Sequence, residues 1–334
     1  MQRQLETPHF TNLGAELSSE KFKKVLVIGL GQLGLPVAKY IQDRGFETYG
    51  FDINLDALEL AHRLYGIKNI QNFSDMDVLV ICISTHRSDD IYSPETGDLM
   101  DLAFKISKEA KNGALVSIES TIPKGTSKRM FEIMNHRVHV VHVPHRWYAL
   151  EEEIHGVNQL RVIGGVSKCC LKLGIEFYGA KGPNQDQFYS IPEDNNEVNF
   201  SETEYDHING SKTLSIPLHP VSEVEIAEIT KIVENTYRYV QIAFAEELYL
   251  YCKENGVCFA ELRDALNTKW NVDILEPREG IGGHCLPKDV KMFLQSSKLA
   301  KSKIVTAATD VDAEYRSFKG QENGTPQSSL PIRN

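Results

Sequence analysis

The feature that most constrains the fold is a glycine-rich turn, GLGQLG at residues 29–34, which directly follows the apolar run KVLVI. A strand that enters such a turn and leaves it as a helix begins a doubly wound sheet and cradles a pyrophosphate. Gly29 allows the tight turn, Gly31 lets a ligand approach the backbone, and Gly34 lets the helix pack on the strand. The helix N-terminus offers N–H donors and partial positive charge to phosphates. The turn therefore predicts a dinucleotide-binding domain.

An acidic residue at the end of the next strand indicates which dinucleotide is bound. Asp52 follows Gly29 by 23 residues and closes the run ETYGFD. A carboxylate at this position accepts hydrogen bonds from the ribose 2′-hydroxyl and repels a 2′-phosphate. We therefore expect NAD as the cofactor, in preference to NADP.

The remaining pattern shows how this domain continues and where it ends. Apolar runs DVLVICIS, ALVSIES, HVVHVP and RVIGG alternate with helix-compatible stretches, which indicates an α/β fold with a parallel sheet wrapped on both faces. The acidic, turn-rich stretch 180–213 is typical of a surface insertion loop. We divide the chain into a disordered tail, an NAD-binding Rossmann domain that includes this loop, an all-α central domain for catalysis and dimerisation, and a second disordered tail, which span residues 1–22, 23–215, 216–315 and 316–334.

The strongest helical signal lies in the central domain. Eight apolar residues recur at spacings of three and four between Ile226 and Tyr251, which predicts one helix over 222–254. At 1.5 Å per residue this helix is roughly 45–50 Å long. A helix of that length usually bridges two domains or builds a dimer interface, so we expect a homodimer through 222–254.

Composition excludes several classes of protein. The 36 basic and 46 acidic residues give a net charge of −10, so we expect no nucleic-acid or anionic-membrane partner. No apolar run approaches the roughly 18 residues of a membrane span, and the polar N-terminus lacks the apolar core of a signal peptide. Six cysteines without a C-x-x-C pair fit a reducing compartment. We expect a cytoplasmic protein without a metal site, since His139 and His142 fall on opposite faces of a strand.

One cysteine near the end of the chain has an unusual setting. Cys285 lies in GIGGHCLPKD, among glycines that allow close approach of a ligand and beside Lys288 and Asp289. A structural cysteine would sit among aliphatic residues, whereas a thiol near positive charge forms the thiolate more readily and acts as a nucleophile. We therefore expect Cys285 to be catalytic.

Polar residues of the predicted long helix suit the same chemistry. Lys231, Asn235 and Arg238 are spaced four and three residues apart and form a second, polar face. Most charged helix faces are simply solvated, but asparagine is a poor helix former. An aldehyde-level intermediate on a cysteine needs cationic and amide donors for its oxyanion, and Lys231 and Asn235 provide them.

Four segments together carry a resemblance to a known family. GLGQLGLP, STIPKGT at 120–126, ENTYRYVQIA at 234–243 and GIGGHCLPKD occur here in the order found in the UDP-glucose and UDP-N-acetylmannosamine 6-dehydrogenases. The chain resembles this family over residues 24–315. The resemblance implies an NAD-dependent, four-electron oxidation of a nucleotide sugar, in which the carbon-6 hydroxyl becomes a carboxylate through a cysteine thiohemiacetal and thioester.

The resemblance also implies roles for single residues. Cys285 is the nucleophile, and Lys231 and Asn235 stabilise the oxyanion. Asp289 and Thr121 assist proton transfer through a water. The expected cofactor contacts are Gly29, Gly31, Gln32, Leu33, Gly34, Asp52, Ser84, Thr85, Ser120 and Thr121. The expected substrate contacts are Arg146, Arg238, Arg278, Gly282, Gly283 and Lys288.

The chain departs from the family pattern in three places. The family carries Pro-Glu after the sixth strand, where its glutamate serves hydrolysis, but this chain reads VPHR at 143–146. Both a base acting on water and a strand-end histidine bonded to backbone stay open for His145. The 180–213 insertion enlarges the link to the long helix. The family also has a further α/β domain that holds the nucleotide, so we expect this chain alone to bind UDP-sugars weakly.

Two other functions stay open. A two-electron alcohol dehydrogenase similar to 6-phosphogluconate dehydrogenase would share the Rossmann domain and the long helix but would need no cysteine. A truncated, non-catalytic dimer that binds NAD would need no catalytic residue at all. The sugar also stays open, because His284 resembles the N-acetylhexosamine enzymes whereas the following LPKD resembles the glucose enzymes.

Overall fold

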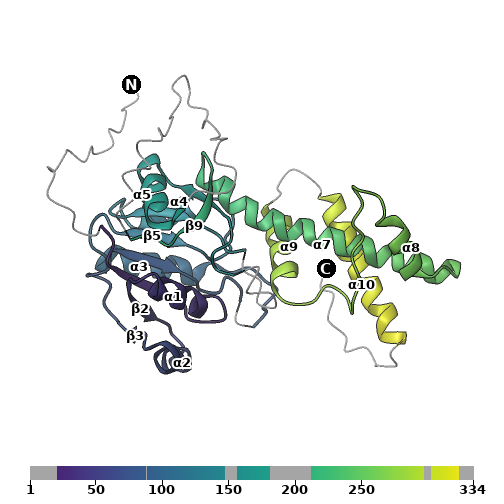
Figure 1. Cartoon of the computed structure of the whole chain (residues 1–334), viewed down its shortest axis with the longest axis horizontal. Helices are drawn as coiled ribbons and strands as arrows, with labels where there is room; N and C mark the ends of the chain where they lie inside the picture. Colours follow the sequence, from purple (N-terminus) through teal and green to yellow (C-terminus); the bar gives the residue numbers. More distant parts are fainter. Residues whose placement is uncertain (1–20, 88, 147–155, 181–211, 297–301, 323–334) are drawn as a thin grey trace, which may run out of the picture.

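The computed structural model describes residues 21–87, 89–146, 156–180, 212–296 and 302–322. An α/β domain forms one end of the molecule and a helical arm projects from it (Figure 1). Most of the predicted first tail and of the predicted insertion lies outside the described residues. The first tail's last residue, Phe22, is buried in the core of the sheet domain.

The α/β domain is built on one nine-stranded sheet in the order β3-β2-β1-β4-β5-β6-β7-β9-β8. Neighbouring strands are parallel except for β6 and β7. The chain starts at a central strand and winds outward in both directions, which confirms the predicted doubly wound fold. The strands are β1 (Lys24–Ile28), β2 (Glu47–Phe51), β3 (Lys68–Asn69), β4 (Val78–Ile81), β5 (Leu115–Ile118), β6 (His139–His142), β7 (Arg161–Gly165), β8 (Gly179–Ala180) and β9 (Ile216–Pro220).

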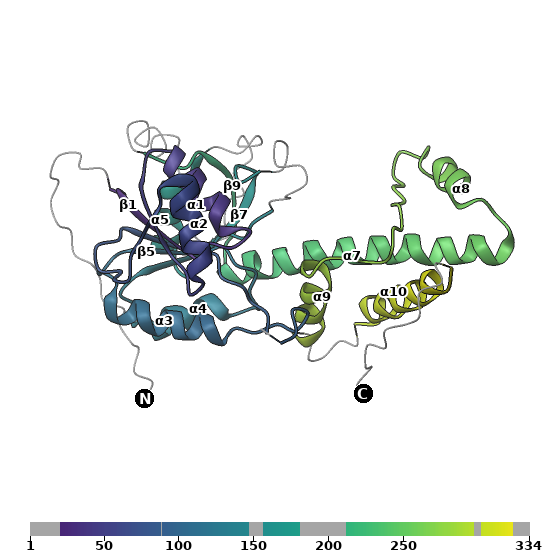
Figure 2. The ribbon, with the colours of Figure 1, turned by 90° about the horizontal axis from the view of Figure 1, so that it is seen from below.

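Helices cover both faces of the sheet (Figure 2). Val37 and Phe177 belong to one core cluster, and Leu99 and Met130 belong to the cluster on the opposite face. Strands β4 and β5 are wholly buried because both of their faces are covered, and this explains their nearly continuous apolar sequences. The helices are α1 (Gly34–Asp43), α2 (Leu55–Tyr65), α3 (Gly97–Glu109), α4 (Thr126–Ile133) and α5 (Lys168–Tyr178).

The arm is built on α7 (Val224–Asn255), a helix of 32 residues that confirms the helix predicted over 222–254. Its root is tied to the sheet domain, because the Glu228 carboxylate accepts the backbone N–H groups of Gly125 at 2.6 Å and Ser127 at 2.8 Å. The other helices of the arm are α8 (Phe259–Leu266), α9 (Cys285–Ser296) and α10 (Lys303–Glu322). Helices α9 and α10 pack on α7 (Figure 2).

The apolar stripe of α7 faces away from the rest of the described chain. Its side chains are between 38% and 64% exposed at Ile226, Ile229, Val233, Tyr237, Phe244 and Tyr251. The residues that α7 buries against its own chain are different ones, among them Ala227, Ile232, Tyr239 and Ala243. The predicted stripe is therefore real, and the described residues leave most of it uncovered, although Val240 packs on the arm's own core and Leu248 is half-buried.

Two predicted domain boundaries are wrong. Strand β9 pairs with β7 and β8, so the sheet domain ends at Pro220 and not at 215. The tail predicted from 316 is helical as far as Glu322, because Tyr315 is fully buried and the Arg316 guanidinium bonds to Asp312 one turn earlier. In the part of the chain that the structure describes, no helix is long and apolar enough to cross a membrane.

Candidate active site

The glycine turn between β1 and α1 has the geometry that its sequence predicts. Gly29 has a φ of +89°, and a Cβ there would lie 2.7 Å from the carbonyl oxygen of Cys82. A Cβ on Gly34 would lie 1.7 Å from the carbonyl oxygen of Gly29, whereas one on Gly31 would meet nothing within 4 Å. Backbone packing therefore requires the two outer glycines, and the space at Gly31 leaves room for a ligand.

The start of α1 and Asp52 complete this part of the site. Gln32 is exposed, and Leu33 caps α1 without a side-chain hydrogen bond. Leu35 already donates to the carbonyl of Gly31 and Pro36 has no N–H, so an anionic ligand would meet the N–H groups of the turn up to Gly34. The Asp52 carboxylate, just after β2, accepts the backbone N–H groups of Leu30 at 2.6 Å and Asn54 at 2.8 Å. Asp52 is thereby held beside the glycine turn, where we expected it.

The loops that follow β4 and β5 are joined by hydroxyl groups. The Ser120 hydroxyl donates to the carbonyl of Ile83 at 2.7 Å, and the Thr85 hydroxyl donates to the carbonyl of Thr121 at 2.8 Å. Ser84 between them is exposed. These loops leave the carboxyl ends of neighbouring parallel strands, which is the edge where ligands of such sheets bind.

The predicted catalytic residues of the arm gather where α9 meets α7. Cys285 is the first residue of α9 and Asp289 lies one turn later on the same face. The Asn235 amide, on α7, donates to the Asp289 carboxylate at 2.5 Å. Lys231 lies one turn before Asn235, close enough to Asp289 and Cys285 for their charges to affect its pKa. The structure thus brings the thiol, the amine, the amide and the carboxylate together.

The electrostatics of Cys285 differ from the prediction. Burial, and then the Asp289 carboxylate, raise the pKa of the thiol, although Lys288 and Lys231 oppose them. Burial also lowers the pKa of the Lys231 ammonium. The nearby lysines therefore do not suffice to make a thiolate in this arrangement, and Cys285 is a thiol at neutral pH.

Lys288, a predicted substrate contact, lies between α9 and the loop that follows β4. Its ammonium is buried, donates to the Thr85 hydroxyl at 3.1 Å and pairs with the Asp289 carboxylate at 3.0 Å. Lys288 therefore joins the sheet domain to α9, and its predicted contact with the substrate stays a prediction. A second contact lies beside it, where the rings of His86 and His284 have centroids 5.6 Å apart.

His145 belongs to a buried polar cluster that the sequence did not reveal. Its Nε2 contacts the Glu119 carboxylate, which also pairs with Arg161 at 3.0 Å and accepts the Tyr178 hydroxyl at 2.5 Å. Glu119 directly follows the apolar strand β5, and Arg161 is the first residue of the apolar strand β7. A charged residue at the end of a buried strand is the local signal that could have indicated the cluster. We call these four residues the Glu119 cluster.

The charges of the Glu119 cluster fix the state of the imidazole. Burial acts to raise the pKa of Glu119, but Arg161 and then His145 outweigh it and hold that pKa well below its usual range. Burial and Arg161 lower the pKa of His145, so at neutral pH the imidazole is uncharged. An ionised carboxylate can only accept, so Nε2 carries the hydrogen and Nδ1 keeps its lone pair. Nδ1 is buried and has no hydrogen-bond partner within the described residues.

The predicted substrate contacts divide into paired and exposed groups. Arg146 pairs with Glu234 of α7 and donates to the carbonyl of Leu160 at 3.0 Å, so its charge is largely neutralised. Arg238 and Arg278 are exposed. The predicted contacts Gly282 and Gly283 are exposed too, and a Cβ on either would meet nothing within 4 Å.

Helix α10 fixes the segment that leads to the cysteine. The Asp312 carboxylate accepts the backbone N–H of Ile281 at 2.8 Å, and Arg316 donates to the Ile281 carbonyl. The Tyr315 hydroxyl donates to two backbone carbonyls earlier in the same segment. Sequence analysis missed these contacts because it ended the ordered chain at 315. They hold the glycines before Cys285 against the arm.

Comparisons with known proteins agree with this architecture. Residues 59–180 match the model of the UDP-glucose/GDP-mannose dehydrogenase family, NAD binding domain, and residues 225–314 match the model of that family's central domain. Together the two matches cover more than half of the chain.

The chain belongs to the UDP-glucose/GDP-mannose dehydrogenase family.

Several members of the family are similar to the chain. It is 28% identical over 301 residues to a UDP-N-acetyl-D-mannosamine dehydrogenase of Methanococcus maripaludis. It is 29% identical over 304 residues to the enzyme of that name from Methanocaldococcus jannaschii. Each alignment covers 84% of this chain and 63% of the relative, so the chain spans less than two thirds of the relatives' length. The solved UDP-D-ManNAc dehydrogenase of Pyrococcus horikoshii superposes with a TM-score of 0.69 at 25% identity, over 92% of this chain and 74% of that one.

Proposed function

We propose that this chain carries out the NAD-dependent oxidation of a nucleotide sugar, in which the carbon-6 hydroxyl becomes a carboxylate. The observation that carries the proposal is the meeting of Cys285, Lys231, Asn235 and Asp289 at the junction of α7 and α9. A two-electron alcohol dehydrogenase has no use for the thiol, whereas oxidation beyond the aldehyde needs a covalent anchor. The names of the relatives direct the choice of the first substrate to UDP-N-acetylmannosamine.

The glycine turn and its surroundings fit NAD. The open space at Gly31, the uncapped start of α1 and the carboxylate of Asp52 offer a place for the pyrophosphate and for the ribose hydroxyls. When bound there, NAD would supply the hydride acceptor for both oxidations, first of the alcohol to the aldehyde and then of the thiohemiacetal to the thioester. We expect Asp52→Ala to narrow the preference for NAD over NADP, as steady-state rates with both cofactors would measure.

The first covalent step is the addition of the Cys285 thiol to the aldehyde. The sulfur–carbon bond forms as the carbonyl becomes an oxyanion, and the thiol proton passes to that oxygen through the nearby polar groups. One N–H of the Asn235 amide is bound to Asp289, and its second N–H is available as a donor. That donor and the Lys231 amine stabilise the oxyanion. The raised pKa of the thiol makes proton transfer an obligatory part of this step.

The last step is hydrolysis of the thioester, and we assign its base to His145. The Glu119 carboxylate holds the ring so that Nδ1, with its free lone pair, is the only nitrogen that can accept a proton from water. Lys231 links the two parts of the site, since its charge affects the pKa of both His145 and Cys285. Water adds to the thioester carbonyl, the carbon–sulfur bond breaks, and Cys285 regains a proton.

The proposal is tested by counting NADH. Purified protein is given UDP-N-acetylmannosamine, and then UDP-glucose, UDP-N-acetylglucosamine and GDP-mannose, and NADH formed is divided by sugar consumed. We expect two NADH per sugar for one of these substrates, and Cys285→Ala should abolish carboxylate formation while the control Cys258→Ala leaves it unchanged. A ratio of one with full activity in Cys285→Ala would support the two-electron alternative, and no NADH with any sugar would support the non-catalytic one.

A second experiment isolates the role of His145. In His145→Ala the thioester should persist on Cys285, and intact-protein mass spectrometry would show the added mass. The control His142→Ala removes a buried histidine of β6 that makes no hydrogen bond to the Glu119 carboxylate but is reached by its charge, and no adduct is expected. Turnover that is equal in His145→Ala and in the wild type would reject the assignment.

We further propose that the α7 stripe forms the interface of a homodimer. The stripe is exposed in the described chain although it is apolar, and an uncovered apolar patch of this kind marks a protein interface. Sedimentation equilibrium should give twice the chain mass, and Tyr237→Glu should shift the protein to monomer.

The unpaired state of all six cysteines supports a cytoplasmic location.

A further inference from the structure

Two groups of metal-ligating side chains occur in the described residues, and they differ in how far their ligand atoms are already used. The first contains Cys82, Glu119 and His145, and the second contains His139, Cys169 and Cys170. In the first group Glu119 already binds Arg161, Tyr178 and His145. That group is therefore satisfied internally and belongs to the site described above.

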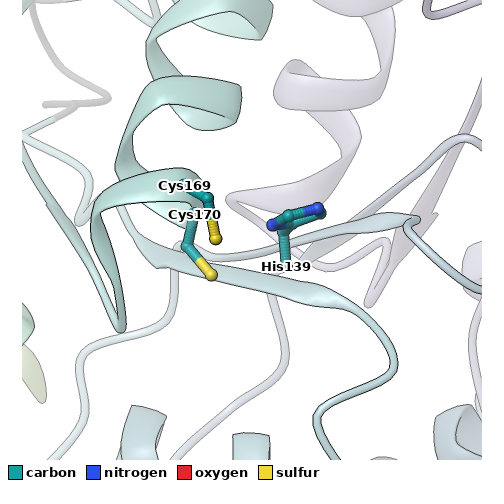
Figure 3. Close-up of side chains that lie close together, drawn as sticks. All are labelled: His139, Cys169 and Cys170. Carbon is teal, nitrogen blue, oxygen red and sulfur yellow. The ribbon is translucent and has the colours of Figure 1, made fainter. Parts of the chain in front are cut away.

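The second group joins β6 to the first turn of α5 (Figure 3). The Sγ atoms of Cys169 and Cys170 and a ring nitrogen of His139 all lie within 4.8 Å of one another. The Ser167 hydroxyl lies 3.1 Å from one sulfur and 3.0 Å from the other, which holds the two thiols side by side. Figure 3 shows the imidazole of His139 beside both sulfurs.

The donor atoms of this group are in a state that suits a metal. Burial, and then the charge of Lys21, lower the pKa of His139, so the imidazole is neutral and has a free lone pair. Its ring makes no hydrogen bond to any other described residue. Cys169 is exposed while Cys170 is buried, so an ion can reach the group from solvent and bind against the sheet.

The types of ligand atom and their spacing also fit Zn²⁺, which binds sulfur and nitrogen ligands in a tetrahedral arrangement. Two sulfurs and one imidazole nitrogen are ligands that Zn²⁺ accepts, with water in the fourth position. Ligand atoms around tetrahedral zinc are about 3.5–3.8 Å apart, so the three atoms, which lie within 4.8 Å of one another, need to approach by at most about 1 Å. We propose that His139, Cys169 and Cys170 bind one Zn²⁺ ion that fastens α5 to β6.

The proposed zinc site is separate from the proposed active site and does not depend on it. His139 is the first residue of β6, whereas His145 lies three residues after the end of that strand. The two groups therefore lie at opposite ends of β6. Zinc binding displaces the two thiol protons to solvent, and no electron is transferred. Burial raises the pKa of Cys170, so the affinity for zinc should increase with pH.

The test measures zinc affinity in the full chain under reducing conditions, with Cys285→Ala as the background so that the thiol beside His284 does not compete. We expect one bound Zn²⁺ per chain by competition with a chromophoric chelator. Co²⁺ in its place should give the near-ultraviolet charge-transfer band of thiolate ligands. Loss of a mere outer-shell partner weakens metal binding about 10–100-fold, so Cys169→Ser and His139→Gln should weaken it at least that much.

Matched variants separate the proposed site from adventitious binding. Cys258→Ser and His62→Gln remove another exposed cysteine and another exposed histidine, and both should bind zinc like the background. Zinc should raise the melting temperature of the background and of these controls but not of Cys169→Ser. Catalytic activity of Cys169→Ser in the otherwise wild-type chain should be unchanged. Equal zinc affinity in Cys169→Ser and Cys258→Ser, or a cobalt spectrum without a thiolate band, would overturn the proposal.

Discussion

Two buried glutamates, one in the sheet domain and one in the arm, have pKa values that are shifted in opposite directions. Glu119 in the sheet domain is 2% exposed and Glu246 on α7 is fully buried. The pKa of Glu119 falls from its ordinary value of 4.5 to about 2, whereas that of Glu246 rises to about 8. Burial raises both values, so the difference comes from the neighbours.

The neighbours differ in the sign of the nearest charge. Glu119 has a buried guanidinium, Arg161, at 3.0 Å and three further hydrogen-bond partners. Neither oxygen of Glu246 has a partner within the described residues, and its nearest charged neighbour is another carboxylate, Asp312, whose effect Arg316 only partly offsets. The comparison teaches that a buried carboxylate stays ionised only where the fold supplies a cation and hydrogen bonds together.

Removal of that cation should have the largest effect. In Arg161→Met the Glu119 carboxylate loses its counter-charge, and a broken buried pair costs about 3–5 kcal/mol of unfolding free energy. Urea denaturation at pH 7 measures the loss. The surface pair of Arg263 and Glu276, also 3.0 Å apart, provides the control, since Arg263→Met should cost less than about 1 kcal/mol. Similar losses in both variants would contradict the role of burial.

Neutralisation of Glu246 should change how stability depends on pH. Folding keeps its proton up to about pH 8, while the unfolded chain releases it near 4.5, so stability falls as pH rises from about 4.5 to 8. The slope is at most about 1.4 kcal/mol per pH unit. In Glu246→Gln this fall should disappear, which urea denaturation at pH 5, 6, 7 and 8 would show.

The contribution of Glu119 to the unfolding free energy should depend on pH in the opposite direction. Its folded pKa of about 2 lies below the ordinary 4.5, so its contribution is present above 4.5 and is lost as pH falls towards 2. Glu246→Gln should leave this acid loss intact. A variant that changed the acid side instead of the alkaline side would reverse the assignment of the two residues.

The smallest effect is expected from the charge beside Glu246. Asp312→Asn removes the repulsion that helps to raise the pKa of Glu246, so the alkaline fall in stability should level off below pH 8. The loss of the bonds from Asp312 to Ile281 and Arg316 lowers stability at every pH, so the measured quantity is the pH at which the fall ends, which should shift by about one unit or less. Denaturation from pH 6 to 9 measures it, and Asp310→Asn, on the same helix but outside these contacts, is the control.

Sequence analysis predicted the features that depend on neighbouring residues. The turn at 29–34 and Asp52 belong to one strand–turn–helix–strand unit, and the spacing on α7 repeats along a single helix. The antiparallel β7 and the strand β9 were missed, because a strand's direction and partner depend on residues far away in the chain. The helix beyond 315 was missed for the same reason, since its apolar and charged contacts are made with α7 and the segment before α9.

The candidate site shows the same division. Cys285, Lys231, Asn235 and Asp289 could be found because each lies in a short motif. The Glu119 cluster could not, because its members come from the ends of β5, β6 and β7 and from α5, and only the folded sheet brings them together. The hydrogen bond from Lys288 to Thr85 could not be predicted either, because the two residues lie 203 positions apart and only the fold brings them together.

The hydrogen bonds of Glu228 anchor α7 near its N-terminal end, which is also the end closest to the proposed active site. At 1.5 Å per residue, Lys231 lies about 4.5 Å along the helix from Glu228, while Tyr251 lies about 35 Å away. A rotation of the helix about the amides of Gly125 and Ser127 would therefore move the far end about eight times as far as the amine of Lys231. Because the bond from Lys288 to Thr85 also ties the arm near its base, a partner bound at the tip would displace the groups of the proposed active site least.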